Sequence, residues 1–412
     1  MFESLRRLHW SIYALALASG VIMTGFFMLV PLLPVYADQL GFNEFDIGVL
    51  VAAFFLGRVL FEFPVGLLSD YVGRRLIMRV ALFLFTVTTA AYALTTDVTL
   101  MVILRLLQGI AASAFAVGSQ SYINDRTPKE SRGLANGVIS SAINAGVIVG
   151  PLLAGVLSKA YSIQTPFWVG GVLGGICFFL ILTVPAVGTP RRPFFPWKPF
   201  WQPDVIKRIF APVLSLPSFS MSLIHFLQWM GIAMFITIAP IFTADKLSWN
   251  ADLVAIAFAA SGAVSMLSSP LLGQISDRSG RINIMAAGLA VSALESFLVL
   301  THPGSALTIV AFAIGGFGAP AYFNSFLSLI GDVTSMEERG AVTGFVGSFG
   351  EWGSIIGSGL VTPILWRNID VAAPLLVDGL VFLLTMALAL MLRRPLTRAI
   401  SGGRRSLIRP WN

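Results

Sequence analysis

The sequence contains little charge, three histidines and a single cysteine, and each shortage excludes a class of protein. Only 11% of its 412 residues are charged and 56% are hydrophobic, whereas roughly a quarter of the residues in a soluble domain are charged. Polar side chains therefore cannot cover a water-soluble protein of this length, and the exterior must face lipid. The lone Cys177 cannot form an intrachain disulfide. Because a metal-ligand cluster and a phosphate-binding loop are also missing, we expect no enzymatic activity, no bound metal and no cofactor.

Long apolar runs fill most of the chain. Each is long enough for a membrane-spanning helix, which needs about 20 mostly apolar residues. A lipid-exposed strand would leave backbone polar groups unpaired, so these runs indicate helices. The sequence thus predicts an all-α membrane protein with twelve spans. The predicted spans are 10–36, 45–69, 76–96, 99–122, 134–157, 165–186, 213–243, 252–274, 282–301, 305–330, 340–363 and 372–392.

Lysine and arginine are distributed unevenly around these spans. With a cytoplasmic N-terminus, 22 of the 27 basic residues lie in the termini and the predicted cytoplasmic loops, and three lie outside. The other two, Arg58 and Arg105, lie within spans. This asymmetry follows the positive-inside rule and accounts for the net charge of +7 without a nucleic-acid partner. We therefore expect a multi-pass monomer in the cell (inner or plasma) membrane with both termini cytoplasmic.

The two halves of the sequence repeat each other at a constant offset of 207 residues. Residues 37–43 match 244–250, residues 66–74 match 273–281, and residues 125–133 match 332–340. Gly146 and Gly150 match Gly353 and Gly357. An offset held over this length without an insertion indicates a duplicated unit. Because the unit has six spans, both copies enter the membrane from the same side, and they form two parallel six-helix repeats.

The repeat predicts four parts of the chain. These are an N-terminal six-helix bundle, a cytoplasmic linker, a C-terminal six-helix bundle and a basic cytoplasmic tail, at 1–186, 187–212, 213–392 and 393–412. The linker is rich in proline, arginine and aromatic residues. Its prolines preclude a long helix, and tryptophan beside lysine and arginine suits a membrane surface. We interpret the linker as an anchor at the inner interface, with a specific lipid-binding role as the alternative.

A glycine and arginine motif connects the second and third spans. Gly66-Leu-Leu-Ser-Asp70-Tyr-Val-Gly73-Arg74-Arg75 resembles the loop motif of the major facilitator superfamily, and a degraded copy follows the eighth span. The resemblance implies the major facilitator fold and a cytoplasmic latch for the outward-open state. The alternative is that the arginines only fix topology. The residues assigned to the latch are Gly66, Asp70, Gly73, Arg74, Arg75, Asp125, Arg132, Gly273, Asp277, Gly280 and Arg281.

The fourth span contains a second motif of this superfamily, Arg105-Leu-Leu-Gln108-Gly109. An arginine inside the membrane is costly unless it finds water, a carbonyl or an acid. In relatives the arginine of this motif is linked to proton movement. Its counterpart in the second half is Phe312, so the fold itself does not require the charge. We favour a functional role for Arg105 over a purely structural one.

The fifth span resembles the antiporter pattern of the superfamily's proton-driven efflux branch. Gly146-Val-Ile-Val-Gly150-Pro151 is followed by Leu-Leu-Ala-Gly155, with Ala154 in place of one glycine. Glycines four residues apart alone indicate only close helix packing, and the proline makes the match more specific. Ser358 stands at the corresponding place in the second half, so we expect the proline bend in the first half only.

Charged residues inside spans are functional candidates. Glu351 lies about eleven residues, or roughly 16 Å, into its span, near the centre of a hydrocarbon core about 30 Å thick. The resemblance places the second and eleventh helices face to face, so Arg58 and Glu351 are expected to pair, with Glu62 competing for the arginine. We assign proton coupling to Glu351, Arg58, Glu62 and Arg105. The alternative is a static Arg58–Glu62 pair within one helix, with Glu351 facing a polar pocket. The roles of Glu295 and Asp378 stay open.

Several polar and aromatic residues lie on helices that line the cavity in this superfamily. They would form a mostly apolar pocket with sparse hydrogen-bonding groups, which suits an amphipathic substrate. His225 titrates near neutral pH when unperturbed, but we favour a hydrogen-bonded lining role over proton handling. The residues assigned to the substrate cavity are Gln108, Ser113, His225, Gln228, Trp229, Tyr322 and Asn324.

These features predict a secondary active transporter that works by alternating access. The favoured function is proton-coupled efflux of a hydrophobic or amphipathic small molecule or drug, with the proton gradient as energy source. The alternatives are an exporter or facilitator of a sugar, lipid or other metabolite, and a membrane sensor or scaffold that does not transport. The expected partners are the substrate, protons and the lipid bilayer.

Overall fold

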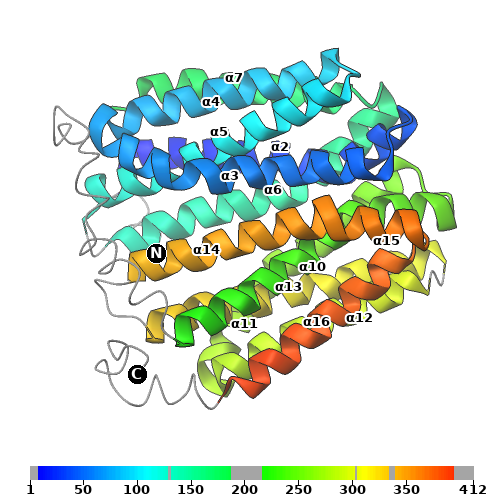
Figure 1. The fold of residues 1–412 in the computed structure, drawn as a ribbon. Coiled ribbons are helices and arrows are strands. Elements are labelled where there is room, and N and C mark those ends of the chain that lie inside the picture. The colour runs from blue at the N-terminus through cyan, green and yellow to red at the C-terminus, as the bar shows by residue number, and fades with distance from the viewer. Residues whose placement is uncertain (1–7, 129–130, 187–215, 302–303, 334–338, 394–412) are drawn as a thin grey trace, which may run out of the picture. The chain divides into compact units, whose positions relative to one another are not determined.

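The computed structural model describes residues 8–128, 131–186, 216–301, 304–333 and 339–393. Within these ranges the secondary structure is helical, and the helices are long and connected by short turns (Figure 1). The predicted linker, the first residues of the seventh predicted span and the predicted tail except for Arg393 lie outside the described residues.

The first half contributes six long helices to the described residues. They match the predicted spans to within a few residues, because the apolar runs that the lipid requires are also the runs that form helices. Their bounds are α2 (Trp10–Gln39), α3 (Glu44–Val72), α4 (Arg74–Ala91), α5 (Val98–Arg126), α6 (Arg132–Ala160) and α7 (Thr165–Thr183), with a short 3₁₀ turn, η1 (Tyr92–Leu94), after α4.

The second half repeats this order in its described residues. Its long helices are α10 (Leu216–Leu247), α11 (Ala251–Ser279), α12 (Arg281–Leu300) and α13 (Ser305–Val333), then the continuous helical run α14 (Arg339–Ile356), η3 (Gly357–Val361) and α15 (Thr362–Asn368), and finally α16 (Ala373–Met391). Ten of the described helices are long and apolar enough to cross a membrane, and α3 and the α14–α15 run are outside that set. The protein is therefore an all-α membrane protein, and the count of twelve spans stays a prediction.

The chain divides into two compact units. The first comprises Met1–Phe195 and Thr243–Gly262, and the second comprises Pro196–Phe242 and Ala263–Asn412. The end of α10 and the start of α11 thus pack with the first unit. Each unit has an apolar core of its own, around Leu82 and Phe115 in the first and around Leu289 and Phe326 in the second.

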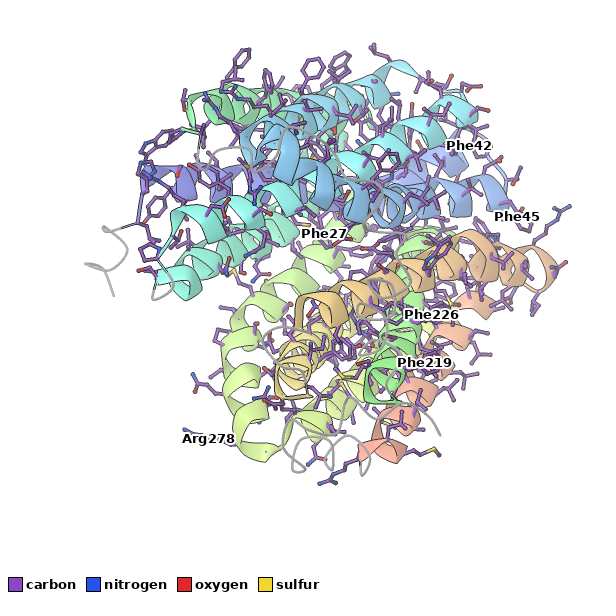
Figure 2. The ribbon with its side chains drawn as sticks, turned by 60° about the vertical axis from the view of Figure 1, so that its left-hand side comes forward. Phe27, Phe42, Phe45, Phe219, Phe226 and Arg278 are labelled. Carbon is purple, nitrogen blue, oxygen red and sulfur yellow. The ribbon has the colours of Figure 1, made fainter. Side chains whose placement is uncertain are left out.

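Large apolar side chains also cover the outside of the helices. On α7, Val172, Ile176 and Phe179 are 62%, 57% and 68% exposed and follow one another at helical spacing. Charged groups instead gather at helix ends, as at Arg278, which extends from the last turn of α11 away from the helices (Figure 2). An apolar flank with charged ends suits a helix that crosses a bilayer.

Glycines bring pairs of helices into backbone contact within each unit. A Cβ atom added at Gly146 or Gly150 of α6 would lie 2.6 Å from the carbonyl oxygen of Gly20 or Thr24 on α2. The repeat reproduces this crossing, because added Cβ atoms at Gly353 and Gly357 of the α14 run would meet the backbone of α10. The glycines of the antiporter-like motif thus serve close helix packing in both halves.

The expectation of a proline bend in the first half only stays a prediction. Pro151 lies inside the continuous helix α6, whereas the corresponding stretch of the second half, Gly357–Val361, is π-helical. Insertion of one residue into a helical turn produces a π-helix without any proline, and such turns are frequent at functional sites. The second half is therefore irregular at this level without a proline, whereas α6 is an unbroken helix through Pro151.

Candidate functional site

The loop motif between α3 and α4 is held by an ion pair to the end of α5. Gly73 takes a φ of +89°, which glycine adopts without strain, and α4 begins directly after it. Arg74 Nε then lies 2.8 Å from Asp125 Oδ2, and its Nη1 donates to the carbonyl oxygen of Ser69 at 3.2 Å. Arg75 Nη2 donates to the carbonyl oxygen of Leu182, at 2.8 Å. The motif therefore ties four helices together at one end of the first unit.

The second unit contains the same ion pair at the repeat offset. Gly280 has a φ of +91°, and Arg281 Nε lies 2.9 Å from Asp332 Oδ2. Sequence reasoning included Arg281 but missed Asp332, although the offset that relates Arg74 to Arg281 also relates Asp125 to Asp332. Gly273 lies near the Asn324 amide, 3.8 Å from an added Cβ. The placements of Gly66 and of the side chains of Asp70, Arg132 and Asp277 lie outside what the structure describes.

Arg105 is buried in the first unit, with only 2% of its surface exposed. Its Nη1 donates to Gln108 Oε1 at 3.2 Å, and Gln108 Nε2 donates to Thr89 Oγ1 at 3.0 Å. Its guanidinium carbon lies 5.6 and 5.2 Å from the ring centroids of Phe26 and Phe54. The positive charge of Arg105 is thus contacted by two aromatic rings and by the amide of Gln108. Gln108, assigned to the substrate cavity, instead joins α5 to α4 inside the bundle.

The predicted coupling charges occupy different environments. Glu351 on α14 is buried, with 8% of its surface exposed, whereas Arg58 is half-buried and Glu62 is exposed on α3. The static pair of Arg58 with Glu62 within one helix stays an alternative prediction. Arg58 and Glu351 belong to different units, and their pairing stays a prediction.

An aromatic cluster on α10 and α13 surrounds His225 in the second unit. Trp229 Nε1 donates to His225 Nε2 at 3.0 Å, and His225 Nδ1 lies 3.1 Å from the Tyr322 hydroxyl. The Phe326 ring stacks on the imidazole with centroids 4.6 Å apart. Because an indole nitrogen can only donate, His225 Nε2 must accept, and the imidazole is neutral with its proton on Nδ1. A protonated His225 could not keep the bond from Trp229.

Glu351 lies beside this aromatic cluster. A Cβ atom added at the preceding Gly350 would lie 2.6 Å from the Trp229 ring and 2.8 Å from the His225 ring. The glycine therefore lets α14 approach the aromatic side chains of α10 closely. The buried Glu351 thus directly follows the residue at which α14 contacts the aromatic cluster.

The remaining residues assigned to the cavity are mostly engaged within their own units. Ser113 Oγ bonds to the Ile110 carbonyl of its own helix at 3.0 Å, and Asn324 Nδ2 donates to the Ser269 carbonyl at 2.9 Å, which joins α13 to α11. Gln228 is fully buried, and neither atom of its amide has a hydrogen-bond partner in the described part of the chain. Buried amides normally form hydrogen bonds. The amide of Gln228 is therefore a candidate to bind water or a polar group of a ligand.

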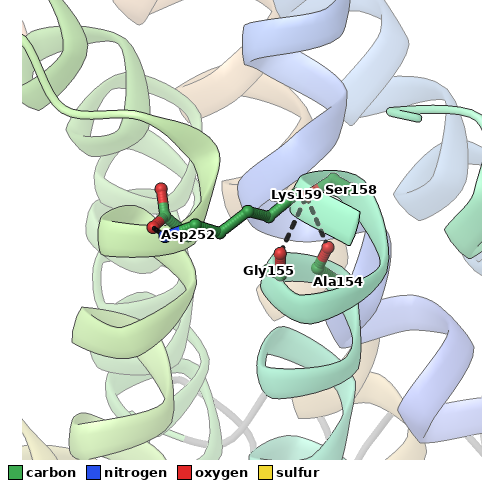
Figure 3. Close-up of polar contacts among 5 residues, drawn as sticks. All are labelled: Ala154, Gly155, Ser158, Lys159 and Asp252. Atoms are coloured by element: carbon green, nitrogen blue, oxygen red, sulfur yellow. Dashed lines mark hydrogen bonds and ion pairs between the residues drawn. The ribbon is translucent and has the colours of Figure 1, made fainter. Parts of the chain in front are cut away.

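Sequence reasoning missed a contact between α6 and the start of α11. Lys159 Nζ lies 2.7 Å from Asp252 Oδ2 (Figure 3). One turn earlier, an added Cβ at Gly155 would lie 2.7 Å from Ala255 Cβ, so Gly155 allows the close approach. Ser158 in between bonds back to the Ala154 and Gly155 carbonyls. The signal was available, because Lys159 is one of only three basic residues in the predicted external loops.

The chain is similar to one protein family over both halves and to individual relatives over 86% and 41% of its length. The family description "Major Facilitator Superfamily" matches residues 15–225 and 221–412. The chain is 26% identical over 360 residues to the quinolone resistance protein NorA of Staphylococcus aureus strain Mu50, which covers 86% of this chain and 89% of that protein. It is 30% identical over 168 residues to the uncharacterized MFS-type transporter MJ1560 of Methanocaldococcus jannaschii, or 41% of this chain and 44% of that one.

Solved structures show the same fold. The nucleoside transporter NupG superimposes with a TM-score of 0.76 at 14% identity, covering 94% of this chain and 99% of that one. The human organic anion transporter MFSD10 gives a TM-score of 0.67 at 17% identity, with 92% and 98% covered. At these identities the likeness concerns the fold alone. With the family match over both halves, it follows that the chain belongs to the Major Facilitator Superfamily and is a multi-pass membrane transporter of the plasma membrane rather than an enzyme.

Proposed function

We propose that this transporter exports a hydrophobic or amphipathic small molecule in exchange for protons. The observation that carries the proposal is the buried Glu351 beside the His225, Trp229 and Tyr322 cluster. Aromatic faces bind flat apolar molecules, and a few polar groups orient them. A carboxyl group at membrane depth can exchange a proton between the two aqueous sides. The similarity to a quinolone resistance protein supports the same assignment.

The proposed cycle uses one carboxyl group in two states. When Glu351 is ionised, its charge is best stabilised by a cation, for which Arg58 of the other unit is the proposed partner. When Glu351 takes up a proton, the attraction is lost, and the two bundles can change their relative tilt. Such rocking of parallel repeats about a central site is the general mode of alternating access in this fold.

The test of this function is transport in vesicles with an imposed pH gradient. The purified protein would be reconstituted and supplied with a panel of cationic, neutral and zwitterionic aromatic compounds. We expect accumulation of aromatic compounds in the compartment from which protons leave, and collapse of the accumulation by a protonophore. Equilibration of a sugar or nucleoside across the membrane without a pH gradient would instead support a facilitator, and transport of none of the compounds would overturn the assignment.

Trp229 is expected to be a substrate-binding residue that also positions His225. Trp229→Phe keeps an aromatic ring but removes the donor to His225 Nε2. We expect KM for an aromatic substrate to rise by about five- to thirtyfold, which corresponds to the roughly 1–2 kcal/mol lost with one hydrogen bond and part of a ring contact. Trp168→Phe on the exposed side of α7 is the matched control. An unchanged KM in Trp229→Phe would remove the cluster from substrate binding.

We propose that two equivalent ion pairs, Arg74–Asp125 and Arg281–Asp332, form the cytoplasmic latch. Both are partly exposed, so each should stabilise the fold by no more than about 1 kcal/mol. We therefore expect Asp125→Asn and Asp332→Asn to change the transport rate while the thermal unfolding temperature stays nearly constant. Variants that lose stability and rate together would indicate a merely structural role.

The Lys159–Asp252 contact is proposed to control how readily α6 separates from α11. The Lys159 side chain is 73% exposed, so the ion pair should contribute little to the free energy of unfolding. We expect it to affect mainly the rate at which α6 separates from α11. We expect Lys159→Asp and Asp252→Lys to alter the transport rate separately and the double variant to return toward the wild-type rate. If the two effects simply add, the pair has no joint role.

A further inference from the structure

Two acids lie among apolar helices of the second unit, on α12 and α16 and not on the helix α14 that contains Glu351. Asp378 on α16 is fully buried, and its Oδ2 lies 2.7 Å from the hydroxyl oxygen of Ser296 on α12. Glu295 directly precedes Ser296, and its carboxyl group would be repelled by that of Asp378 if both were ionised. We call Glu295 and Asp378 the α12–α16 acid pair.

Glycines on the neighbouring helices make room for both carboxyl groups. On α13, a Cβ atom added at Gly315 would collide with the carboxyl of Glu295. On α10, a Cβ atom added at Gly231 would lie 2.9 Å from Asp378 Oδ1. That Oδ1 atom is buried and has no hydrogen-bond partner among the described residues. Asp378 is therefore enclosed by helices, with one carboxyl oxygen still lacking a partner, and Glu295 is half-buried.

Within the described ranges, the helices around the acid pair place no lysine or arginine in an ion pair with it. The basic residue of α12, Arg281, lies 14 positions before Glu295, or about 21 Å along the helix. On α10, Lys246 lies 15 positions beyond Gly231, about 22 Å away, and is paired with Asp245. The remaining charged or titratable groups described on the packed elements are His225 on α10, Tyr322 and Asp332 on α13, and the exposed Arg367 and Asp370 on α15 and before α16. In the described residues, no lysine or arginine forms an ion pair with either acid.

The hydrogen bonds around Ser296 fit a protonated Asp378. The Ser296 oxygen lies within reach of two acceptors, Asp378 Oδ2 at 2.7 Å and the Ser292 carbonyl oxygen at 3.1 Å. One hydroxyl hydrogen cannot fully satisfy both. If Asp378 carries a proton, it donates to Ser296, and Ser296 donates to Ser292. An uncompensated carboxylate in an apolar interior is costly and neutralises instead.

We propose that the α12–α16 acid pair is a proton-binding site separate from Glu351. The proton resides on Asp378 or Glu295 and is exchanged with the aqueous side at which α12 ends and α16 begins. Both acids lie five residues from those helix ends, Leu300 and Ala373, a depth of about 8 Å. By the distribution of basic residues this is the external side. The proposal concerns proton binding by the resting protein and does not depend on any substrate.

Infrared spectroscopy of the protein in lipid nanodiscs tests the proposal without transport. The C=O stretching band of a protonated carboxyl group lies at a different infrared frequency from the bands of a carboxylate, and it shifts in heavy water. We expect the wild-type protein to show this band at neutral pH and Glu295→Gln with Asp378→Asn together to lose most of it. Asp245→Asn, which removes an exposed paired acid, is the matched control and should keep the full band.

Three measurements decide the outcome: the unfolding temperature of Asp378→Asn, the infrared band of the double variant, and the effect of sodium on the wild-type band. Asp378→Asn alone should unfold at about the wild-type temperature, because its amide resembles a neutral carboxyl group. An unchanged band in the double variant would overturn the proposal, and so would strong destabilisation by Asp378→Asn, since that would show an ionised, compensated Asp378. Loss of the wild-type band on replacing choline chloride by sodium chloride would also overturn it, because the pair would then bind sodium in place of a proton.

Discussion

Glu351→Gln is expected to abolish transport driven by a pH gradient. The substitution closely preserves the size of a buried side chain that is only 8% exposed. The glutamine, however, can no longer gain or lose a proton. Accumulation of substrate against its gradient should fall to the level seen with a protonophore. Equilibrating exchange of substrate without a gradient should persist, because the aromatic cluster next to Glu351 is unchanged.

The matched control for this variant is Asp245→Asn. Asp245 lies exposed near the end of α10 and pairs with its neighbour Lys246, so its loss should leave gradient-driven accumulation intact. Glu62→Gln tests the competing acid on α3. If Glu351→Gln accumulates substrate as the wild type does, Glu351 has no coupling role, and a loss in Glu62→Gln would transfer that role to Glu62.

Gly150→Val is expected to destabilise the first unit strongly. A Cβ atom at Gly150 would lie 2.6 Å from the Thr24 carbonyl oxygen and 2.9 Å from the Met28 backbone nitrogen. Both neighbours are backbone atoms of α2 and cannot rotate away, so the helices must separate. Overpacking of this kind costs about 1–3 kcal/mol or more. We expect a clear fall in the thermal unfolding temperature and little transport.

Gly137→Val on the same helix provides the control. An added Cβ at Gly137 meets no atom within 4 Å, so the same chemical change should leave the unfolding temperature nearly constant. Equal effects at Gly137 and Gly150 would show that α6 responds to helix propensity and not to its contact with α2.

The helices were predictable because lipid imposes one requirement on every span. A run of apolar residues must form backbone hydrogen bonds within itself, so the ends of α2, α7 and α13 fall within a few residues of their predicted positions. The repeat offset also relates the crossings at Gly146 and Gly353, because duplicated units inherit the same close contacts.

The side-chain partners were not predictable in the same way. Arg105 is stacked by Phe26 and Phe54 from two other helices, and no periodicity in the sequence relates these residues. Gln108 was assigned to the cavity, and nothing in the sequence indicated that its amide donates to Thr89 of α4. The π-helical turn at Gly357–Val361 has no sequence marker such as proline. Rotation about a helix axis and local changes of pitch depend on tertiary packing.

Proton movement caused by the substrate is the most direct measurement of proton-coupled export. Vesicles containing the purified protein and a pH-sensitive dye would receive an outward gradient of an aromatic substrate, with no initial pH gradient. Export by exchange predicts that protons enter the vesicles as substrate leaves and that Glu351→Gln shows no such change. Protons that leave together with the substrate, or no substrate-dependent proton movement in the wild type, would contradict proton-coupled export.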